Sequence, residues 1–182
     1  LEVGSTGAWT RIDHNLIYNT LPDAIEGPSK FGIYLDFGGG NDVFDGRYIV
    51  DHNVIYNVYV PILINHINEV LVYNNTGVFV GDPKIAIVNG NGGTGVSDTI
   101  RNNIMGGTTN DASGSGSLMN AVKENNIFNA KNSVLTDLFV DPFNFNFNLK
   151  PSATTAIDKG LDVKPYNDPL TGLPDIGAFE YG

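Results

Sequence analysis

The chain has 182 residues, of which 41% are hydrophobic and 10% aromatic, a composition typical of a folded domain with its own core. Ten basic residues stand against 20 acidic ones, so the clustered Lys and Arg that bind nucleic acid are not available. The absence of cysteine excludes disulfides and thiolate metal sites, and no apolar run is long enough to cross a bilayer.

One phrase occurs twice with almost no change. Residues 13–19 read Asp-His-Asn-Leu-Ile-Tyr-Asn, residues 51–57 read Asp-His-Asn-Val-Ile-Tyr-Asn, and looser copies follow. A polar-Asn-apolar-apolar phrase that returns at the spacing of a supersecondary unit is typical of a stacked repeat, in which each unit covers the apolar face of the next. The copies align on five asparagines: Asn15, Asn53, Asn75, Asn103 and Asn126.

Short apolar segments lie between these phrases, at residues 32–36, 61–65 and 84–88. They are rich in β-branched and aromatic residues, turn-forming Asn, Gly and Asp separate them, and no helical period persists. Each repeat therefore holds an early strand, a strand that ends in Asn, and a third short strand. The sequence predicts an all-β coil of parallel strands, with three strands per rung and about five rungs.

Alternation along the strand that ends in Asn predicts which side chains face inward. Ile12, Val50, Val72 and Ile100 take the inward position. Lys123 stands at the same place in the last repeat, which predicts a bulge or a slipped register there.

The same alternation predicts that His14 and His52 point inward beside the turn, in a structural role. We interpret the five aligned asparagines as a ladder in which each side chain bonds its neighbours above and below. The residues two positions before them form a predicted outward stripe: Asp13, Asp51, Tyr73, Arg101 and Glu124.

The last quarter of the chain breaks the repeat. It contains the alternating Phe143, Phe145 and Phe147 and ends in an apolar segment with Ile176 and Phe179. A stacked coil leaves an apolar cross-section open at its end, which another segment has to cover. We therefore expect rungs over residues 1–134 and a carboxy-terminal cap, packed on the last rung, over residues 135–182. The tail acids are predicted to hold capping turns through Asx bonds, with Ca2+ ligation as the alternative.

Three features together resemble the right-handed parallel β-helix proteins of the carbohydrate-active kind, which include polysaccharide lyases, some glycoside hydrolases and related binding domains. The features are Gly-Ile-Tyr-Leu-Asp at residues 32–36, the repeated His-Asn phrase, and the tail with Leu-Lys-Pro-Ser at 149–152 and Asp-Ile-Gly-Ala-Phe-Glu-Tyr at 175–181. The resemblance covers nearly the whole chain. It implies a right-handed parallel β-helix in a secreted or cell-surface bacterial protein that acts on a polysaccharide.

In the resembled enzymes the substrate groove follows outward strand faces walled by loops, and this implies a set of site residues here. Glycoside hydrolysis uses two carboxylates, which Asp36 could form with Asp51 or with Glu26. Elimination from a uronic acid instead needs a base and a cation, roles open to Lys30, Arg47 and Tyr34. Four residues are predicted to bind substrate: Glu26, Asn65, His66 and Tyr73.

Two kinds of function remain open at this stage. The first is the carboxy-terminal part of a secreted glycoside hydrolase or polysaccharide lyase; the second is a non-catalytic carbohydrate-binding or surface-adhesion module. The net charge of −10 favours a neutral glycan, or an acidic one bridged by Ca2+. Repeat residues begin as early as Trp9, so we expect a second chain or a preceding amino-terminal part to cover the first rung.

Overall fold

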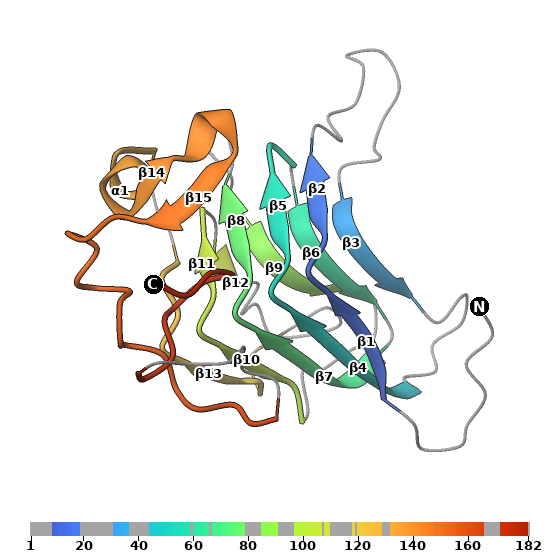
Figure 1. Cartoon of the computed structure of the whole chain (residues 1–182). Helices are drawn as coiled ribbons and strands as arrows, with labels where there is room; N and C mark the ends of the chain where they lie inside the picture. The colour runs from blue at the N-terminus through green and yellow to red at the C-terminus, as the bar shows by residue number, and fades with distance from the viewer. Residues whose placement is uncertain are drawn as a thin grey trace, which may run out of the picture.

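The computed structural model describes most of the repeat region and the tail. The described residues are 9–18, 31–36, 44–58, 60–65, 67–78, 85–90, 97–106, 108–109, 118, 120–128, 132–165 and 172–181. Over these residues the chain is mostly β-strand, and three parallel sheets form its body (Figure 1). The prediction of an all-β body with parallel strands is confirmed.

Each parallel sheet takes every third strand of the chain. Sheet A has the order β1 (Thr10–Asp13), β4 (Phe44–Asp51), β7 (Ile67–Tyr73), β10 (Thr99–Arg101) and β13 (Val122–Glu124). Sheet B joins β2 (Leu16–Tyr18), β5 (Val54–Tyr56), β8 (Thr76–Val78) and β11 (Ile104–Met105). Sheet C joins β3 (Phe31–Asp36), β6 (Val60–Asn65), β9 (Ile85–Gly90) and β12 (Thr108–Thr109). We call one consecutive strand from each sheet a rung, so that β1, β2 and β3 form the first rung.

The tail adds a few short elements of a different kind. Helix α1 (Asn132–Leu138) leads into β14 (Phe139–Asp141), which pairs antiparallel with β15 (Asn146–Leu149) after the 3-10 turn η1 (Pro142–Asn144). Figure 1 shows this orange segment and the red carboxy terminus beside β8 and β11, far from β1.

The interior between the sheets is filled by β-branched and other aliphatic side chains. Val50, Val72 and Ile100 are fully buried at matched positions of sheet A, and Ile12 packs against the same cluster from the first rung. Ile55 and Met105 enter this cluster from sheet B. Burial of this apolar surface drives the stacking of the rungs. The inward positions predicted from alternation are confirmed.

The aligned asparagines form a continuous ladder at the turn between sheets A and B. The main-chain N–H and the side-chain Nδ2 of each one donate to the Oδ1 of the next, as in Asn75 to Asn103 at 3.0 and 2.9 Å. Asn75 Nδ2 also donates to the carbonyls of Tyr73 and, one rung earlier, Val50. The same bonds run from Asn15 through to Asn126. The predicted ladder is therefore confirmed.

The residue before each ladder asparagine, not the asparagine itself, has the left-handed backbone. The φ angles are 54° at His14, 51° at His52, 50° at Asn74, 56° at Asn102 and 50° at Asn125. A left-handed residue interrupts strand alternation, so alternation does not fix where these two histidine side chains point. His52 is buried, whereas the side chain of His14, on the edge rung, is half exposed, and the two rings stack with centroids 5.1 Å apart.

The last strand of sheet A keeps its register. Lys123 pairs with Ile100 and Glu124 with Arg101, so the predicted bulge or slip is wrong. Lys123 is tolerated at the inward position because its Nζ reaches the carbonyl of Leu118 at 3.3 Å. The long aliphatic stem lets the ammonium leave the apolar interior.

The tail packs along the outer side of sheet B. Val54, Tyr56, Val78 and Ile104 point outward there and are buried in a second apolar cluster with the tail. Phe145 reaches the first rung, with its ring centroid 5.3 Å from that of Tyr18. The contacts of the tail thus extend well beyond the last rung, on which we expected it to pack. The division into residues 1–134 and 135–182 stays a prediction.

A glycine allows the closest approach between the tail and sheet B. Gly177 has a φ of 111°, and a Cβ there would lie 2.9 Å from Ile104 Cδ1 and 3.0 Å from Thr76 Oγ1. Its N–H donates to the carbonyl of Asn102 at 2.8 Å, and the N–H of Ala178 donates to Thr76 Oγ1 at 2.9 Å. Only a residue without a side chain fits this position.

Substitution of a central ladder asparagine should destabilise the fold strongly. Asn75→Ala removes three bonds donated by Nδ2 and leaves the donors of Asn53 without their acceptor. We expect a loss of about 3–5 kcal/mol in the free energy of unfolding, measured by denaturant titration with circular dichroism. Asn15→Ala, at the exposed end of the ladder, is the control, with a loss of roughly 1 kcal/mol. Equal losses for the two variants would contradict a buried, continuous ladder.

A methyl group at Gly177 should loosen the tail. Gly177→Ala combines an unfavourable φ with a clash against Ile104 and Thr76, so we expect a loss of about 2–4 kcal/mol in unfolding free energy. Gly172→Ala is the matched control, because the nearest atom to its Cβ is the end of the exposed Asp158 side chain. Its stability should change by less than about 0.5 kcal/mol. A wild-type melting temperature for Gly177→Ala would contradict the close approach.

Candidate functional site

The outer face of sheet C holds three of the residues that the sequence singled out. In β3 the side chains of Ile33 and Leu35 enter the core, so the alternate residues Tyr34 and Asp36 point outward and are exposed. Asn65 ends β6 and pairs in register with Asp36, which places the two side chains next to each other. Alternation and parallel pairing are therefore sufficient to assemble this group.

These three side chains form one hydrogen-bonded network. Tyr34 Oη donates to Asp36 Oδ2 at 2.6 Å, and Asn65 Nδ2 donates to Asp36 Oδ1 at 3.0 Å. Asn65 Nδ2 also lies 3.4 Å from Tyr34 Oη. Asn65 is buried, whereas Tyr34 and Asp36 are exposed, so a buried amide holds a surface carboxylate in place. We call Tyr34, Asp36 and Asn65 the sheet C network.

The carboxylate of Asp36 determines how Tyr34 can react. Its hydrogen bond raises the pKa of Tyr34, and partial burial and the negative charge of Asp36 act in the same direction. The hydrogen bond from Asn65 opposes this shift but is outweighed. The phenol is therefore a hydrogen-bond donor at neutral pH, and the predicted use of Tyr34 as the base of an elimination has no support from its surroundings.

The ring of Tyr34 is available to a ligand. Half of the residue's surface is exposed, and the ring of Phe31 lies beside it at a centroid distance of 5.5 Å. An aromatic neighbour of this kind restricts the orientation of the ring. Sequence reasoning did not select Phe31, although its place in the same strand as Tyr34, just before Gly32, was the available signal.

Asp51 lies in another sheet and has different partners. It ends β4 in sheet A, where its carboxylate is completely buried and accepts two hydrogen bonds from the guanidinium of Arg11, one of them at 2.8 Å from Nε. The Nδ1 of His52 lies 2.9 Å from Asp51 Oδ2, and the other ring nitrogen of His52 bonds Asn74. The structure does not bring Asp51 together with Asp36, because consecutive strands belong to different sheets.

The surroundings of Asp51 favour its charged form. Burial raises the pKa of Asp51, but hydrogen bonds from Arg11 and His52 and the electrostatic interaction with these two side chains lower the pKa by more. The net result is a pKa below the usual range for aspartate. A buried, ion-paired carboxylate of this kind holds neighbouring rungs together and is a poor candidate for proton transfer. Arg11 was not among the predicted site residues, and its partner is 40 positions away in sequence.

Two other predicted residues also belong to sheet A. Arg47 lies at an irregularity in the pairing of β4 with β7, has a φ of 49°, and donates from Nε to Glu69 Oε2 at 3.0 Å. Tyr73 ends β7 beside Asp51 and is buried, with 6% of its surface exposed. Neither lies on the outer face of sheet C. The predicted roles of Glu26, Lys30 and His66 fall outside the described residues.

Among the described tail acids, Asp162 makes the predicted Asx bond, whereas Asp175 accepts from main-chain N–H groups farther away in the sequence. Asp175 is buried, and its carboxylate accepts from the N–H groups of Asp158 at 2.7 Å and Tyr181 at 2.6 Å. Asp162 Oδ1 accepts from the N–H of Lys164 at 3.2 Å. Among the residues that the structure describes, no three His, Asp or Glu side chains are grouped so that they could hold a metal ion.

The acid sensitivity of the fold should depend on Asp51. Because its pKa is lower in the folded chain than in the unfolded one, its stabilisation is present above the unfolded pKa of about 3.9 and is lost as the pH falls through the folded pKa. We expect Asp51→Asn to flatten the fall of unfolding free energy below about pH 4 and to lose about 1–3 kcal/mol at pH 7.

Asp13→Asn is the control for this measurement. Asp13 pairs with Asp51 in register, but its side chain is 36% exposed and lies 3.7 Å from Arg11 Nε. Its substitution should change stability at pH 7 less than that of Asp51. An unchanged acid profile for Asp51→Asn would show that this ion pair does not hold the rungs.

No protein-family model matches the chain, and neither a curated protein nor a solved structure does. Within the described part of the chain, no helix is long and apolar enough to span a membrane.

Proposed function

We propose that the chain is a right-handed parallel β-helix domain that binds a neutral oligosaccharide or polysaccharide on the outer face of sheet C. The observation that carries the proposal is the sheet C network, in which an exposed aromatic ring adjoins a carboxylate and an amide held in fixed positions. A secreted or cell-surface location, as the resemblance implies, is part of the same proposal.

The topology supports the handedness. Each pair of neighbouring strands in sheet A is joined through one strand of sheet B and one of sheet C, as β1 is joined to β4 through β2 and β3. Crossover connections between parallel strands of one sheet are right-handed in nearly all proteins. The parallel pairing of the strands in all three sheets is compatible with such a coil.

The chemistry of the network suits a sugar. A pyranose ring has apolar C–H faces, which pack on an aromatic ring, and hydroxyl edges, which need both donors and acceptors. The exposed ring of Tyr34 can pack on the C–H face, and Asp36 with Asn65 can bond the hydroxyl edges. The hydrogen bonds inside the network orient these groups before a ligand arrives, which reduces the entropy lost on binding.

Charge and carboxylate placement favour binding over cleavage and a neutral glycan over an acidic one. The net charge of −10 and the exposed Asp36 would repel a uronate chain. Hydrolysis uses a pair of carboxylates, but Asp51 lies in another sheet from Asp36, and Glu26, the other predicted partner, lies outside the described residues. A binding module therefore fits the described geometry better than a glycoside hydrolase or a polysaccharide lyase.

A glycan array tests this proposal. The full chain is applied to neutral and uronic oligosaccharides, with and without a chelator, and the soluble products are analysed. We expect chelator-independent retention on a neutral glycan without product formation. Tyr34→Ala and Asp36→Ala should each weaken binding at least tenfold, because they remove the ring or the acceptor. Tyr34→Phe, which keeps the ring, should lose less than Tyr34→Ala.

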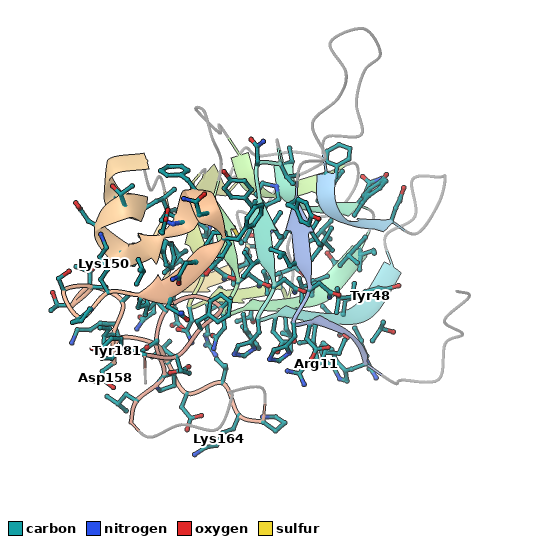
Figure 2. All side chains as sticks on the ribbon, turned by 45° about the horizontal axis from the view of Figure 1, so that its top comes forward. Arg11, Tyr48, Lys150, Asp158, Lys164 and Tyr181 are labelled. Carbon is teal, nitrogen blue, oxygen red and sulfur yellow. The ribbon has the colours of Figure 1, made fainter. Side chains whose placement is uncertain are left out.

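Tyr181→Ala is the matched control. Tyr181 is an exposed aromatic residue of the tail, and Figure 2 shows it at the other end of the molecule from Arg11 and Tyr48. Its loss should leave glycan binding unchanged. Binding that survives both Tyr34→Ala and Asp36→Ala would refute the site, and product formation abolished by Asp36→Ala would replace the binding module with an enzyme. Neither binding nor turnover on any glycan would indicate a purely structural coil.

A further inference from the structure

The first rung lies at an edge of all three parallel sheets. β1, β2 and β3 are each terminal in the strand order of their sheet, so one side of each has no strand partner among the described residues. Leu16 and Tyr18 of β2 are about half exposed, whereas Val54 and Tyr56 at the same positions one rung later are buried. An edge strand of this kind is a template for another strand.

The asparagine ladder ends at this edge with a defined polarity. Asn53, Asn75 and Asn103 each accept at Oδ1 from the main chain and side chain of the preceding ladder asparagine. No described residue donates to Oδ1 of Asn15, which is exposed. A partner that continues the ladder has to present an asparagine in the same turn.

The outward side chain of Asp13 requires that a docking segment carries a positive charge. Asp51 is neutralised by Arg11, which comes from the rung before it. Asp13 occupies the same position one rung earlier, and its carboxylate is 36% exposed, with His14 Nδ1 at 2.9 Å and Arg11 Nε at 3.7 Å. Arg11 lies one rung before Asp51 and pairs with it, but no described residue lies one rung before Asp13 to supply an equivalent cation. Figure 2 shows Arg11 on the lower border of the molecule beside β1.

We propose that the first rung is a docking edge for a strand–turn–strand segment that lies outside residues 1–182 and carries Arg or Lys four residues before an asparagine. Such a segment has the pattern of residues 11–18 themselves. Its cation meets Asp13 as Arg11 meets Asp51, and its asparagine donates to Asn15 Oδ1 as Asn15 donates to Asn53. Its apolar pair covers Ile12 and Ile17 at the end of the core. This edge is separate from the sugar face of sheet C, and the proposal does not depend on sugar binding.

Neither a second copy stacked end to end nor residues 1–8 meets these requirements. In the last rung Val122 occupies the position equivalent to Arg11, and Glu124 would stand over Asp13 with the same charge. Residues 1–8 contain neither Arg nor Asn. The charge pattern therefore selects a rung other than the last rung of this chain and other than residues 1–8.

A peptide with the sequence of residues 9–19 is the probe. The peptide is labelled with a fluorophore and titrated into the full chain, and binding is followed by fluorescence anisotropy. We expect a Kd of about 10–100 μM, since an unstructured peptide has to order as it binds. The same peptide with Asn15→Ala, or with Arg11→Asp, should bind at least tenfold more weakly.

Exchanging the charges of Asp13 in the protein and Arg11 in the peptide distinguishes specific docking from non-specific apolar binding. The protein variant Asp13→Arg should lose the wild-type peptide but bind the Arg11→Asp peptide, because the pair is restored in reverse. Glu124→Arg, on the last rung, is the control and should bind the wild-type peptide as the parent chain does. Circular dichroism shows that each variant is folded.

Three results would overturn the proposal. They are no binding of the wild-type peptide up to about 1 mM by NMR shift titration, equal binding of wild-type and Arg11→Asp peptides to the parent chain, and self-association of the chain that the peptide cannot disrupt. The last result would assign the edge to a second copy. Because the readout is peptide binding, its failure leaves the glycan experiment unaffected, and the reverse also holds.

Discussion

The hydrogen bonds of the asparagine ladder are the constraint on which the rest of the structure depends. A buried amide that misses its partners costs free energy, whereas an aliphatic side chain tolerates a shifted neighbour. Asn53, Asn75 and Asn103 are completely buried and bond both the previous and the next rung. A slip by one residue would break these bonds and move the inward side chains of each shifted strand to its outer face. The ladder therefore fixes the register from which all outer faces follow.

The outer faces are built from pairs that join one rung to the next. The sheet C network combines β3 with β6, and the ion pair of Arg11 with Asp51 combines β1 with β4. Arg101 and Glu124 form a similar pair between β10 and β13, with the shortest contact at 2.7 Å. Each side chain thus depends on a partner from a neighbouring rung, and a candidate site arises where one pair stays exposed beside an aromatic ring. Tyr34 provides that ring, whereas the tail covers much of sheet B.

Most of the strand arrangement was predictable because residues at equivalent positions of the repeat contact one another in the structure. Each copy of the phrase marks the same turn, so the ladder and the inward residues followed from alignment and alternation, and so did the outward positions of Tyr34 and Asp36. The errors came where alternation stops or where a partner is distant. The left-handed φ of His14 interrupts the alternation, and Arg11, the cation that pairs with Asp51, lies 40 positions earlier in the sequence. The packing of the tail on the outer side of sheet B involves residues outside the repeat, so no periodic pattern in the sequence predicts it.

The most direct measurement of the central claim is NMR of the asparagine side-chain amides. If successive turns are stacked through the ladder, the Nδ2 protons of Asn53, Asn75 and Asn103 exchange slowly with solvent. Nuclear Overhauser effects then connect them in the single series Asn15, Asn53, Asn75, Asn103 and Asn126. Rapid exchange of these protons, or contacts that link the asparagines in any other order, would contradict the account.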